Sequence, residues 1–388
     1  MTRDVAIIGV GMTKFGEFWE RGYRSLITEA GSKAIIDAGI DGKDIDAVYV
    51  GSMTPGRLIG QEHVGALVAD YAGLTGIPAT RVEAACASGG LALHQAFLAI
   101  KSGLYDIVVV GGVEKMTDVS TEHATVALAG AADQEWEGFH GITFPGLYAM
   151  MARRHMIDYG TTEEQISMVA VKNHANGKLN PNAQFQYEVT LEDVLHSSMV
   201  ADPLRLLHCS PITDGAATVV LASSEKAKKL CERPIWVRGS AIATDTLSLH
   251  ERKSITRVEA SIVAGKKAYE MAGVKPDDID FAEVHDCFTI AEILAIESLG
   301  FCKMGEGGKT TENGETRIGG RIPINTSGGL KAKGHPVGAT GIAQAIEATW
   351  QLRGQAEKRQ VKGAKVGLAQ NVGGSGATCT VHIFSPEK

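Results

Sequence analysis

The sequence of 388 residues contains only six cysteines, and no two of them form a CxxC pair or have the spacing of metal ligands. They are Cys86, Cys209, Cys231, Cys287, Cys302 and Cys379. So few thiols in so long a chain do not resemble the disulfide framework of a secreted protein, and we expect a reducing, cytoplasmic location. The cysteine pattern therefore predicts neither a disulfide scaffold nor a metal site.

The sequence also lacks an excess of basic over acidic residues, and it has no long apolar run. Lysine and arginine number 38 against 45 acidic residues, which gives a net charge of −7 at pH 7. That balance lacks the basic excess of a nucleic-acid-binding surface. No apolar run approaches the roughly 20 residues of a membrane helix, and we expect no signal peptide before the first predicted strand, at residues 5–10. We expect no nucleic-acid partner and no membrane partner.

A third absence concerns dinucleotide cofactors. Gly9-Val10-Gly11 follows the first predicted strand, but the third glycine of the dinucleotide-binding motif would fall at Lys14. What the sequence does contain is 44% hydrophobic residues, 46 glycines and predicted strands that alternate with predicted helices. This pattern is typical of a layered α/β protein, and the length is too great for one compact core.

An internal repeat indicates how the chain is divided. Residues 38–46 (AGIDGKDID) are echoed at 272–280 (AGVKPDDID), and the strand at 235–239 restates the opening strand. The offset stays near 230 residues, so we predict two similar α/β domains, 1–230 and 231–388. Residues of about 116–209 have no counterpart in the second half and are expected to form an inserted loop domain. Such an insertion is a common place for substrate recognition, although a helical cap that packs on itself is an equal alternative.

Cys86 lies in a predicted strand–turn–helix unit built of very small residues. A cysteine at a helix N-terminus meets free N–H groups and the positive end of the helix dipole, which favours the nucleophilic thiolate. A lone cysteine is more often an inert core residue. At a somewhat longer offset, however, residues 86–99 resemble 335–348, so the second domain would place His335 where the first places Cys86. The two side chains are then expected to meet across a pseudo-twofold axis.

Other candidate stretches have ordinary structural alternatives. His285 or His335 alone would more often be a structural histidine, Cys287 could fill core volume, and residues 373–376 could be a simple glycine turn. Taken together and in order from about residue 4 to 384, the motifs resemble those of thiolases. The motifs are Ala85-Cys86-Ala87-Ser88-Gly89, Gly111-Gly112-Val113-Glu114-Lys115-Met116, Asp214-Gly215-Ala216-Ala217, Gly334-His335-Pro336 and the glycine loop 373–376.

The resemblance implies the thiolase fold, in which two duplicated α/β domains form an α-β-α-β-α arrangement of five layers with an inserted loop domain. His285-Asp286-Cys287-Phe288 is similar to the motif of archaeal and sterol-carrier-protein-type thiolases. The commonest bacterial thiolases carry Asn-Glu-Ala-Phe there and a second catalytic cysteine where this chain has Asn371. That departure means that another residue must remove the α-proton of the second substrate.

The resemblance also implies a role for each site residue. Cys86 is expected to be acylated, with His335 as its base, and Cys287 is the expected base for the α-proton. One oxyanion hole is expected from the N–H groups of Cys86 and Gly373, and a second from His335 together with His285. Asp286 would orient its neighbours, while Ser210 and Phe288 are expected near the pantetheine arm of the substrate.

The expected activity is that of an acetyl-CoA C-acetyltransferase, which converts two acetyl-CoA to acetoacetyl-CoA and CoA and back. Three alternatives stay open: a 3-ketoacyl-CoA thiolase of longer chains, a decarboxylating β-ketoacyl synthase, and a non-catalytic acyl-CoA-binding scaffold subunit. We expect coenzyme A thioesters as substrates, no cofactor and no metal. We also expect a homodimer or homotetramer in the mevalonate pathway. Family relatives further imply a complex with hydroxymethylglutaryl-CoA synthase and a small OB-fold/zinc-ribbon protein.

Overall fold

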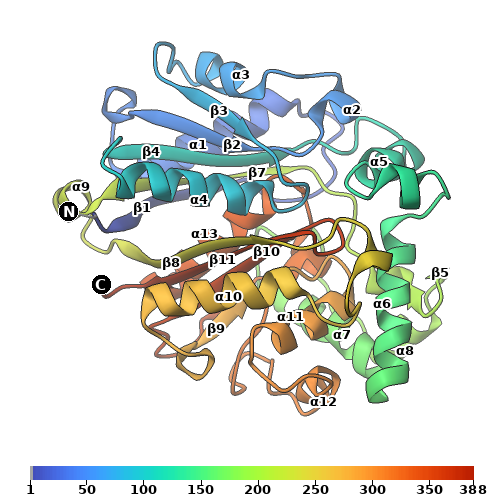
Figure 1. Ribbon diagram of the computed structural model, residues 1–388. Coiled ribbons are helices and arrows are strands. Elements are labelled where there is room, and N and C mark those ends of the chain that lie inside the picture. The colour runs from blue at the N-terminus through green and yellow to red at the C-terminus, as the bar shows by residue number, and fades with distance from the viewer. Residues whose placement is uncertain (1–2) are drawn as a thin grey trace.

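The computed structural model describes residues 3–388, and most strands of that part belong to one mixed sheet (Figure 1). The strand order in this sheet is β3-β2-β4-β7-β1-β8-β11-β10-β9. The strands are β1 (Val5–Met12), β2 (Ala47–Gly51), β3 (Ala79–Val82), β4 (Ile107–Glu114), β7 (Gly215–Ser223), β8 (Ile235–Thr244), β9 (Phe281–Glu283), β10 (Gly367–Gly373) and β11 (Thr378–Ser385). A separate hairpin pairs β5 (Met199–Ala201) with β6 (Leu204–Arg205).

The helices lie between the two halves of the sheet, on its outer sides and at one end. They are α1 (Tyr23–Ala38), α2 (Pro55–Ile59), α3 (Val64–Tyr71), α4 (Ser88–Lys101), α5 (Thr121–Ala129), α6 (Phe144–Tyr159), α7 (Glu163–Lys178), α8 (Leu191–His196), α9 (Ser224–Leu230), α10 (Glu259–Ala272), α11 (Thr289–Ser298), α12 (Gly307–Glu312) and α13 (Thr340–Arg353). Among residues 3–388, none of the helices is both long and apolar enough to cross a membrane.

The two halves of the sheet have a similar strand order, read outward in both directions from the contact between β1 and β8. There Ala6 pairs with Trp236 and Ile7 with Ile235, so the halves are hydrogen bonded into one sheet. The repeated sequence forms the same local structure twice. Gly39 ends α1 and Gly273 ends α10, each in the left-handed conformation, and each is followed by a 3-10 turn and a strand. Glycine accepts this positive φ without the steric penalty of a side chain.

The layered arrangement follows from where the apolar faces are buried. Helices α4 and α13 pack on each other and on strands of both halves, which Figure 1 shows for α4 between the upper and lower strands. Helix α1 covers the outer side of the first half and α10 the outer side of the second. One apolar cluster lies between the halves and one lies under each outer layer. The α-β-α-β-α order of the thiolase fold is therefore confirmed.

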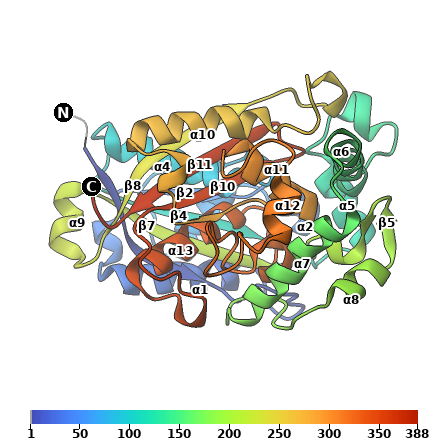
Figure 2. The ribbon, with the colours of Figure 1, turned by 90° about the horizontal axis from the view of Figure 1, so that it is seen from below.

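The segment between β4 and β7 forms a cap at one end of the molecule. It contains α5 to α8 and the small hairpin, drawn in green and yellow-green beside α11 and α12 in both views (Figures 1 and 2). Side chains of α6, such as Leu147 and Met151, share an apolar cluster with Phe288 and Ile290 of the second half. The cap is thus anchored over the loop that carries Cys287. The domain boundary at residue 230 and the limits 116–209 of the insert stay predictions.

Candidate active site

Cys86 lies in a tight turn between β3 and α4. Ala85 has a φ of 51°, a left-handed conformation that costs a residue other than glycine roughly 1–2 kcal/mol. Ser88 supports the turn, because its Oγ donates to the Ala85 carbonyl at 2.6 Å and accepts from the Ala84 N–H at 2.9 Å. The predicted strand, turn and helix are confirmed, and Cys86 comes two residues before the first residue of α4.

The Cys86 sulfur is held as a thiol. Although part of the residue is accessible, burial of the sulfur raises the pKa of Cys86 to about 12, against the lowering effect of the N–H groups of Gly374 and of Cys86 itself. The expectation that the helix N-terminus favours the thiolate of Cys86 over the thiol is therefore wrong for this state, because the loss of water outweighs the nearby dipoles. A base has to take the proton when the sulfur attacks.

His335 is a neutral imidazole whose tautomer follows from its contacts. Its Nδ1 lies 2.7 Å from Thr340 Oγ1, and that hydroxyl donates its own hydrogen to the Pro336 carbonyl. Thr340 must therefore accept from Nδ1–H, which leaves a lone pair on Nε2. Burial, with a smaller contribution from Lys333, lowers the pKa of His335 to about 3, so the ring is uncharged at neutral pH. In this tautomer Nε2 is an acceptor, as a base requires.

His285 has the opposite tautomer, and Asn371 sets it. The Asn371 amide nitrogen lies 2.9 Å from the Cys86 carbonyl and 3.1 Å from His285 Nδ1, while its oxygen accepts from the Gly90 N–H. Because an amide nitrogen only donates, His285 Nδ1 is an acceptor and the hydrogen is on Nε2. That Nε2–H is buried and has no acceptor among the described residues. Burial lowers the pKa of His285 well below its usual range, so this donor is neutral.

The structure brings Cys86, His285 and His335 together. The Cys86 sulfur and one ring nitrogen of each histidine all lie within 4.8 Å of one another, and the two rings meet edge to face with centroids 5.0 Å apart. The site therefore contains a thiol, an acceptor nitrogen and a donor nitrogen. Cys86, His285 and His335 are of the residue types that bind zinc, but in the forms just described Cys86 and His285 carry hydrogens and only His335 Nε2 offers a free lone pair, so the set does not fit a metal ion in this state. That the protein needs no metal stays a prediction.

Cys287 faces the same space from the second half of the molecule. Burial raises the pKa of Cys287 well above its usual range, and the nearby Cys86 adds to the effect. A general base works best with a pKa near the operating pH, and the surroundings alone do not give Cys287 such a pKa. The Ser210 N–H donates to the Cys287 carbonyl at 2.9 Å, and the Phe288 ring stacks on Tyr148 at 4.7 Å.

A cavity of about 140 Å³ connects these residues. Its wall is largely apolar and comes from both halves and from the cap. It is formed by Cys86, Met116, Thr125, Leu128, Phe144, Pro145, Tyr148, Cys209, Ser210, Pro211, Ile212, Cys287, Phe288, His335, Val337 and Gly374. The predicted site residues that line the cavity are Cys86, Ser210, Cys287, Phe288 and His335, whereas His285 and Gly373 do not line it. In the glycine loop, the N–H that reaches the Cys86 sulfur is that of Gly374, one residue beyond the predicted Gly373.

Comparison with known proteins identifies the family. The family model described as thiolase, N-terminal domain, matches residues 5–225, and the one described as thiolase C-terminal domain-like matches residues 241–386. The chain belongs to the thiolase family. As a thiolase it is an acyltransferase, and the expected family and fold are confirmed.

Individual relatives agree with this assignment over the full length. This thiolase is 60% identical to an acetyl-CoA acetyltransferase of Methanothermobacter thermautotrophicus, over 99% of this chain and 100% of that protein. It is 54% identical to an acetyl-CoA acetyltransferase of Methanocaldococcus jannaschii, over 100% of both chains. Among solved structures, the "Ltp2-ChsH2(DUF35) aldolase" matches with a TM-score of 0.87 and 28% identity, over 100% of this chain and 99% of that chain.

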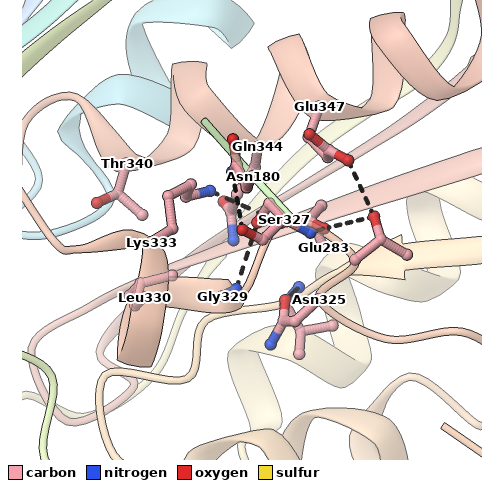
Figure 3. A network of polar contacts seen from close by, with 12 residues as sticks. Asn180, Glu283, Asn325, Ser327, Gly329, Leu330, Lys333, Thr340, Gln344 and Glu347 are labelled. Atoms are coloured by element: carbon pink, nitrogen blue, oxygen red, sulfur yellow. Dashed lines mark hydrogen bonds and ion pairs between the residues drawn. The ribbon is translucent and has the colours of Figure 1, made fainter. Parts of the chain in front are cut away.

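A buried polar network ties together the two histidine-bearing segments of this thiolase (Figure 3). Glu283 precedes His285 by two residues, and Lys333 precedes His335 by two. Glu283 accepts from the Ser327 N–H at 3.0 Å, and the Lys333 amine lies 3.7 Å from its carboxylate, with both side chains almost fully buried. The network thereby holds the loop after β9 against the segment that leads into His335.

Asp286 acts on the same segment, as the sequence predicts for an orienting residue. Its carboxylate accepts from the N–H groups of Leu330 and Lys331 and from the Asn173 amide at 2.7 Å. Burial raises the pKa of Asp286 to about 7. The carboxylate contacts the turn before His335 and does not line the cavity.

Sequence reasoning missed the second layer of thiolase residues that fix the histidines. Thr340 and Lys333 lie close to His335 in the sequence, but nothing in the pattern distinguishes them from ordinary loop residues. Asn371 was visible only as a departure from the family motif. Tyr148 was part of an insert rich in aromatic residues and could not be singled out, because its contacts are with residues more than 130 positions away.

Proposed function

We propose that this thiolase transfers an acetyl group between two molecules of acetyl-CoA, forming acetoacetyl-CoA and CoA, and catalyses the reverse thiolysis. The two archaeal relatives named acetyl-CoA acetyltransferase, at 60% and 54% identity, support the choice of acyl group. The cavity of about 140 Å³ supports it too, since it is well below the 300–1,000 Å³ of sites for larger ligands. A 3-ketoacyl-CoA thiolase of longer chains would need a larger space beside Cys86.

In the first half-reaction Cys86 takes the acetyl group. His335 Nε2 accepts the thiol proton while the sulfur attacks the thioester carbon, and the N–H groups of Cys86 and of the glycine loop 373–374 stabilise the oxyanion. The carbon–sulfur bond to CoA then breaks, and the CoA sulfur takes the proton back from His335. The observation that carries this step is the approach of the Cys86 sulfur and both histidine nitrogens within 4.8 Å.

In the second half-reaction Cys287 first loses its thiol proton to water and then, as a thiolate, removes an α-proton from the second acetyl-CoA. The His285 Nε2–H is the neutral donor available to the enolate oxygen. His335 can share that role, as predicted, only while it carries a proton on Nε2. The enolate carbon attacks the acetyl carbon, and the bond to the Cys86 sulfur breaks. The Cys86 thiolate then takes the proton from Cys287, which returns Cys86 to a thiol and leaves Cys287 as the thiolate that removed the α-proton.

Two substrates test this proposal against a decarboxylating synthase. Acetyl-CoA alone should give acetoacetyl-CoA when product is drawn off by a coupled 3-hydroxyacyl-CoA dehydrogenase. Product from malonyl-CoA but none from acetyl-CoA would overturn the proposal. The coupling is needed because the uncoupled condensation is unfavourable.

A pair of variants tests the alternative of a silent acyl-CoA-binding scaffold. Cys86→Ala should abolish thiolysis of acetoacetyl-CoA, and Cys287→Ala should lower it by about 10²–10⁴, the range of general acid–base catalysis. A scaffold would bind acyl-CoA equally in all three forms and show no turnover that either change could remove. Unchanged thiolysis in Cys287→Ala would assign the α-proton to another base.

The cellular setting is part of the same proposal. We place the reaction in the cytoplasm, at the entry to the mevalonate pathway, without a cofactor and in a homodimer or homotetramer. A solved relative whose title pairs Ltp2 with a DUF35 component supports the idea of a protein partner for this chain. A complex with hydroxymethylglutaryl-CoA synthase and a small OB-fold/zinc-ribbon protein would consume the product and draw the condensation forward.

A further inference from the structure

Cys287 has to be a thiolate before it can accept an α-proton, yet its surroundings oppose that charge. It is buried beside the Cys86 thiol, and Asp286 is the adjacent residue. His335 across the cavity is neutral, and Cys209 on the cavity wall is a thiol. The groups that favour the thiolate are the Phe288 N–H and one side chain, that of Tyr148 on the cap helix α6.

The Tyr148 hydroxyl is held between the two halves of the site. Tyr148 is 3% exposed, and its ring stacks on Phe288 with an interplanar angle of 30°. Its hydroxyl donates to the Gly374 carbonyl at 3.1 Å. Tyr148 and Cys287 line the same cavity, and the Tyr148 ring stacks on Phe288, the residue after Cys287, so the Cys287 sulfur is the second acceptor near this hydroxyl. Because a phenol has one hydrogen, Tyr148 can serve only one of these acceptors at a time.

We propose that the Tyr148 hydroxyl is a two-position donor, bonded to the Gly374 carbonyl while Cys287 is a thiol and turned onto the sulfur when Cys287 is a thiolate. The inference rests on the proposed role of Cys287 as base. It makes Tyr148 a positioning residue, which acts on the substrate through Cys287. A hydrogen bond to a charged acceptor is stronger than one to a neutral carbonyl, so the hydrogen follows the charge.

The surroundings allow this rotation without displacing the glycine loop. The Arg252 guanidinium donates to the Ser375 carbonyl and, at 3.1 Å, to the Ser375 hydroxyl, so the residue after Gly374 has its own anchor. Burial also keeps the phenol protonated, since the pKa of Tyr148 is raised well above its usual range. The hydrogen is therefore always available, and only its direction changes. In this structure the Gly374 N–H is directed at the Cys86 sulfur, on the side of the residue opposite its carbonyl.

The test measures the ionisation of Cys287 directly, without turnover. In a Cys86→Ala background, the rate of Cys287 alkylation by iodoacetamide is followed against pH by peptide mass spectrometry. Tyr148→Phe keeps the ring and removes the hydroxyl, so the apparent pKa of Cys287 should rise by about one unit or more. The matched control is Tyr269→Phe, which removes a buried hydroxyl that donates to the Leu299 carbonyl at 2.9 Å, away from the cavity wall. It should leave the profile unchanged.

A second measurement guards against a folding defect in Tyr148→Phe. Incorporation of 3-fluorotyrosine at position 148 makes the phenol a stronger donor and should lower the apparent pKa of Cys287. Shifts in opposite directions from the two changes support the proposal. An unchanged alkylation profile in both, or equal shifts in the Tyr269→Phe control, overturns it.

Turnover separates this inference from the proposed function. In the Cys86-containing chain, Tyr148→Phe should lower kcat for thiolysis about tenfold while acetyl loading of Cys86 is kept. If Cys287→Ala retains full thiolysis, the proposed base is wrong, whatever the alkylation profiles show. If Cys287→Ala is inactive and Tyr148→Phe lowers kcat with no shift in the alkylation profile, Tyr148 only packs against Phe288 and the two-position donor is refuted.

Discussion

Asn371 illustrates how one residue can change the chemistry of a thiolase site. Where the commonest bacterial thiolases have a second catalytic cysteine, this chain has an amide that bonds to the Cys86 carbonyl, the Gly90 N–H and His285. The amide cannot remove a proton, but it fixes the tautomer of His285 so that Nε2 carries the hydrogen. The residue that replaces the second catalytic cysteine thus orients a different catalytic group, the His285 imidazole.

Replacement of Asn371 by aspartate tests this role. The isosteric carboxylate attracts a hydrogen to His285 Nδ1, which removes the donor from Nε2. We expect kcat for thiolysis to fall by about 10²–10³, the usual effect of losing one oxyanion donor. Steady-state kinetics give the rate, and ¹⁵N chemical shifts of His285 report the tautomer.

Asn176→Asp is the matched control, since the Asn176 amide is also buried and donates to the Asn325 carbonyl at 3.0 Å. A wild-type His285 tautomer in Asn371→Asp would contradict the assignment. So would an equal loss of rate in the control.

At the scale of elements, the site depends on how closely α4 and α13 approach. Glycines form the contact, because a Cβ on Gly89 would lie 2.7 Å from the Gly338 carbonyl and one on Gly341 would lie 2.3 Å from the Gly90 N. Real Cβ atoms do not come so near to backbone. The absence of side chains lets the two helix beginnings meet and brings His335 to Cys86.

A single methyl group should separate the two helices. Gly341→Ala is expected to lower the free energy of unfolding by about 1–3 kcal/mol, since the added Cβ meets backbone that cannot move aside easily. It should also slow acetylation of Cys86 by displacing His335. Urea unfolding and the rate of acetyl loading measure the two effects.

Gly31→Ala provides the contrast within a helix. Gly31 lies inside α1 and a Cβ there has nothing within 4 Å, so the change should raise the free energy of unfolding by about 0.5–1 kcal/mol. If both alanine variants are equally stable, close approach at Gly341 is not what sets the distance between the helices.

The sequence was most informative about the helices and strands. The echo of residues 38–46 at 272–280 predicted two equivalent helix–turn–strand units, and both are present with the same glycine ends. The pairing of Cys86 with His335 followed from a weaker echo and is confirmed by their proximity. The ionisation of Cys86 could not be predicted, since the cost of burial depends on packing that no local pattern records. The side chain of Tyr148 reaches the site only because the cap folds over α11.

For the whole molecule, buried neutral histidines predict how stability depends on pH. Burial lowers the pKa of His335 and His382 to about 3 and that of His174 and His208 to about 4. Below pH 6.5 the unfolded chain gains protons that these rings cannot accept in the folded state. The free energy of unfolding therefore falls as the pH drops from about 6.5 toward 4. Glu114 and Asp286, with pKa values raised to about 7, oppose this trend.

The variant His382→Gln separates the contribution of His382 to this pH dependence from the opposing contributions of Glu114 and Asp286. His382 lies away from the cavity wall and donates from Nε2 to the Gly90 carbonyl at 3.0 Å, a bond that glutamine can also form. Between pH 7.5 and pH 5 the wild type should lose about 2 kcal/mol more unfolding free energy than the variant. Urea titrations at both pH values measure the difference. Parallel losses in the two proteins would mean that His382 titrates normally in the folded state.

The central claim is that the Cys86 sulfur carries the acyl group between the two half-reactions. Its most direct test is peptide mass spectrometry after brief exposure to acetyl-CoA and acid quenching. The account predicts an acetyl adduct on Cys86 in the wild type and in Cys287→Ala, and none in Cys86→Ala. An adduct on Cys287 or Cys209 in its place, or turnover with no adduct on Cys86, would contradict it.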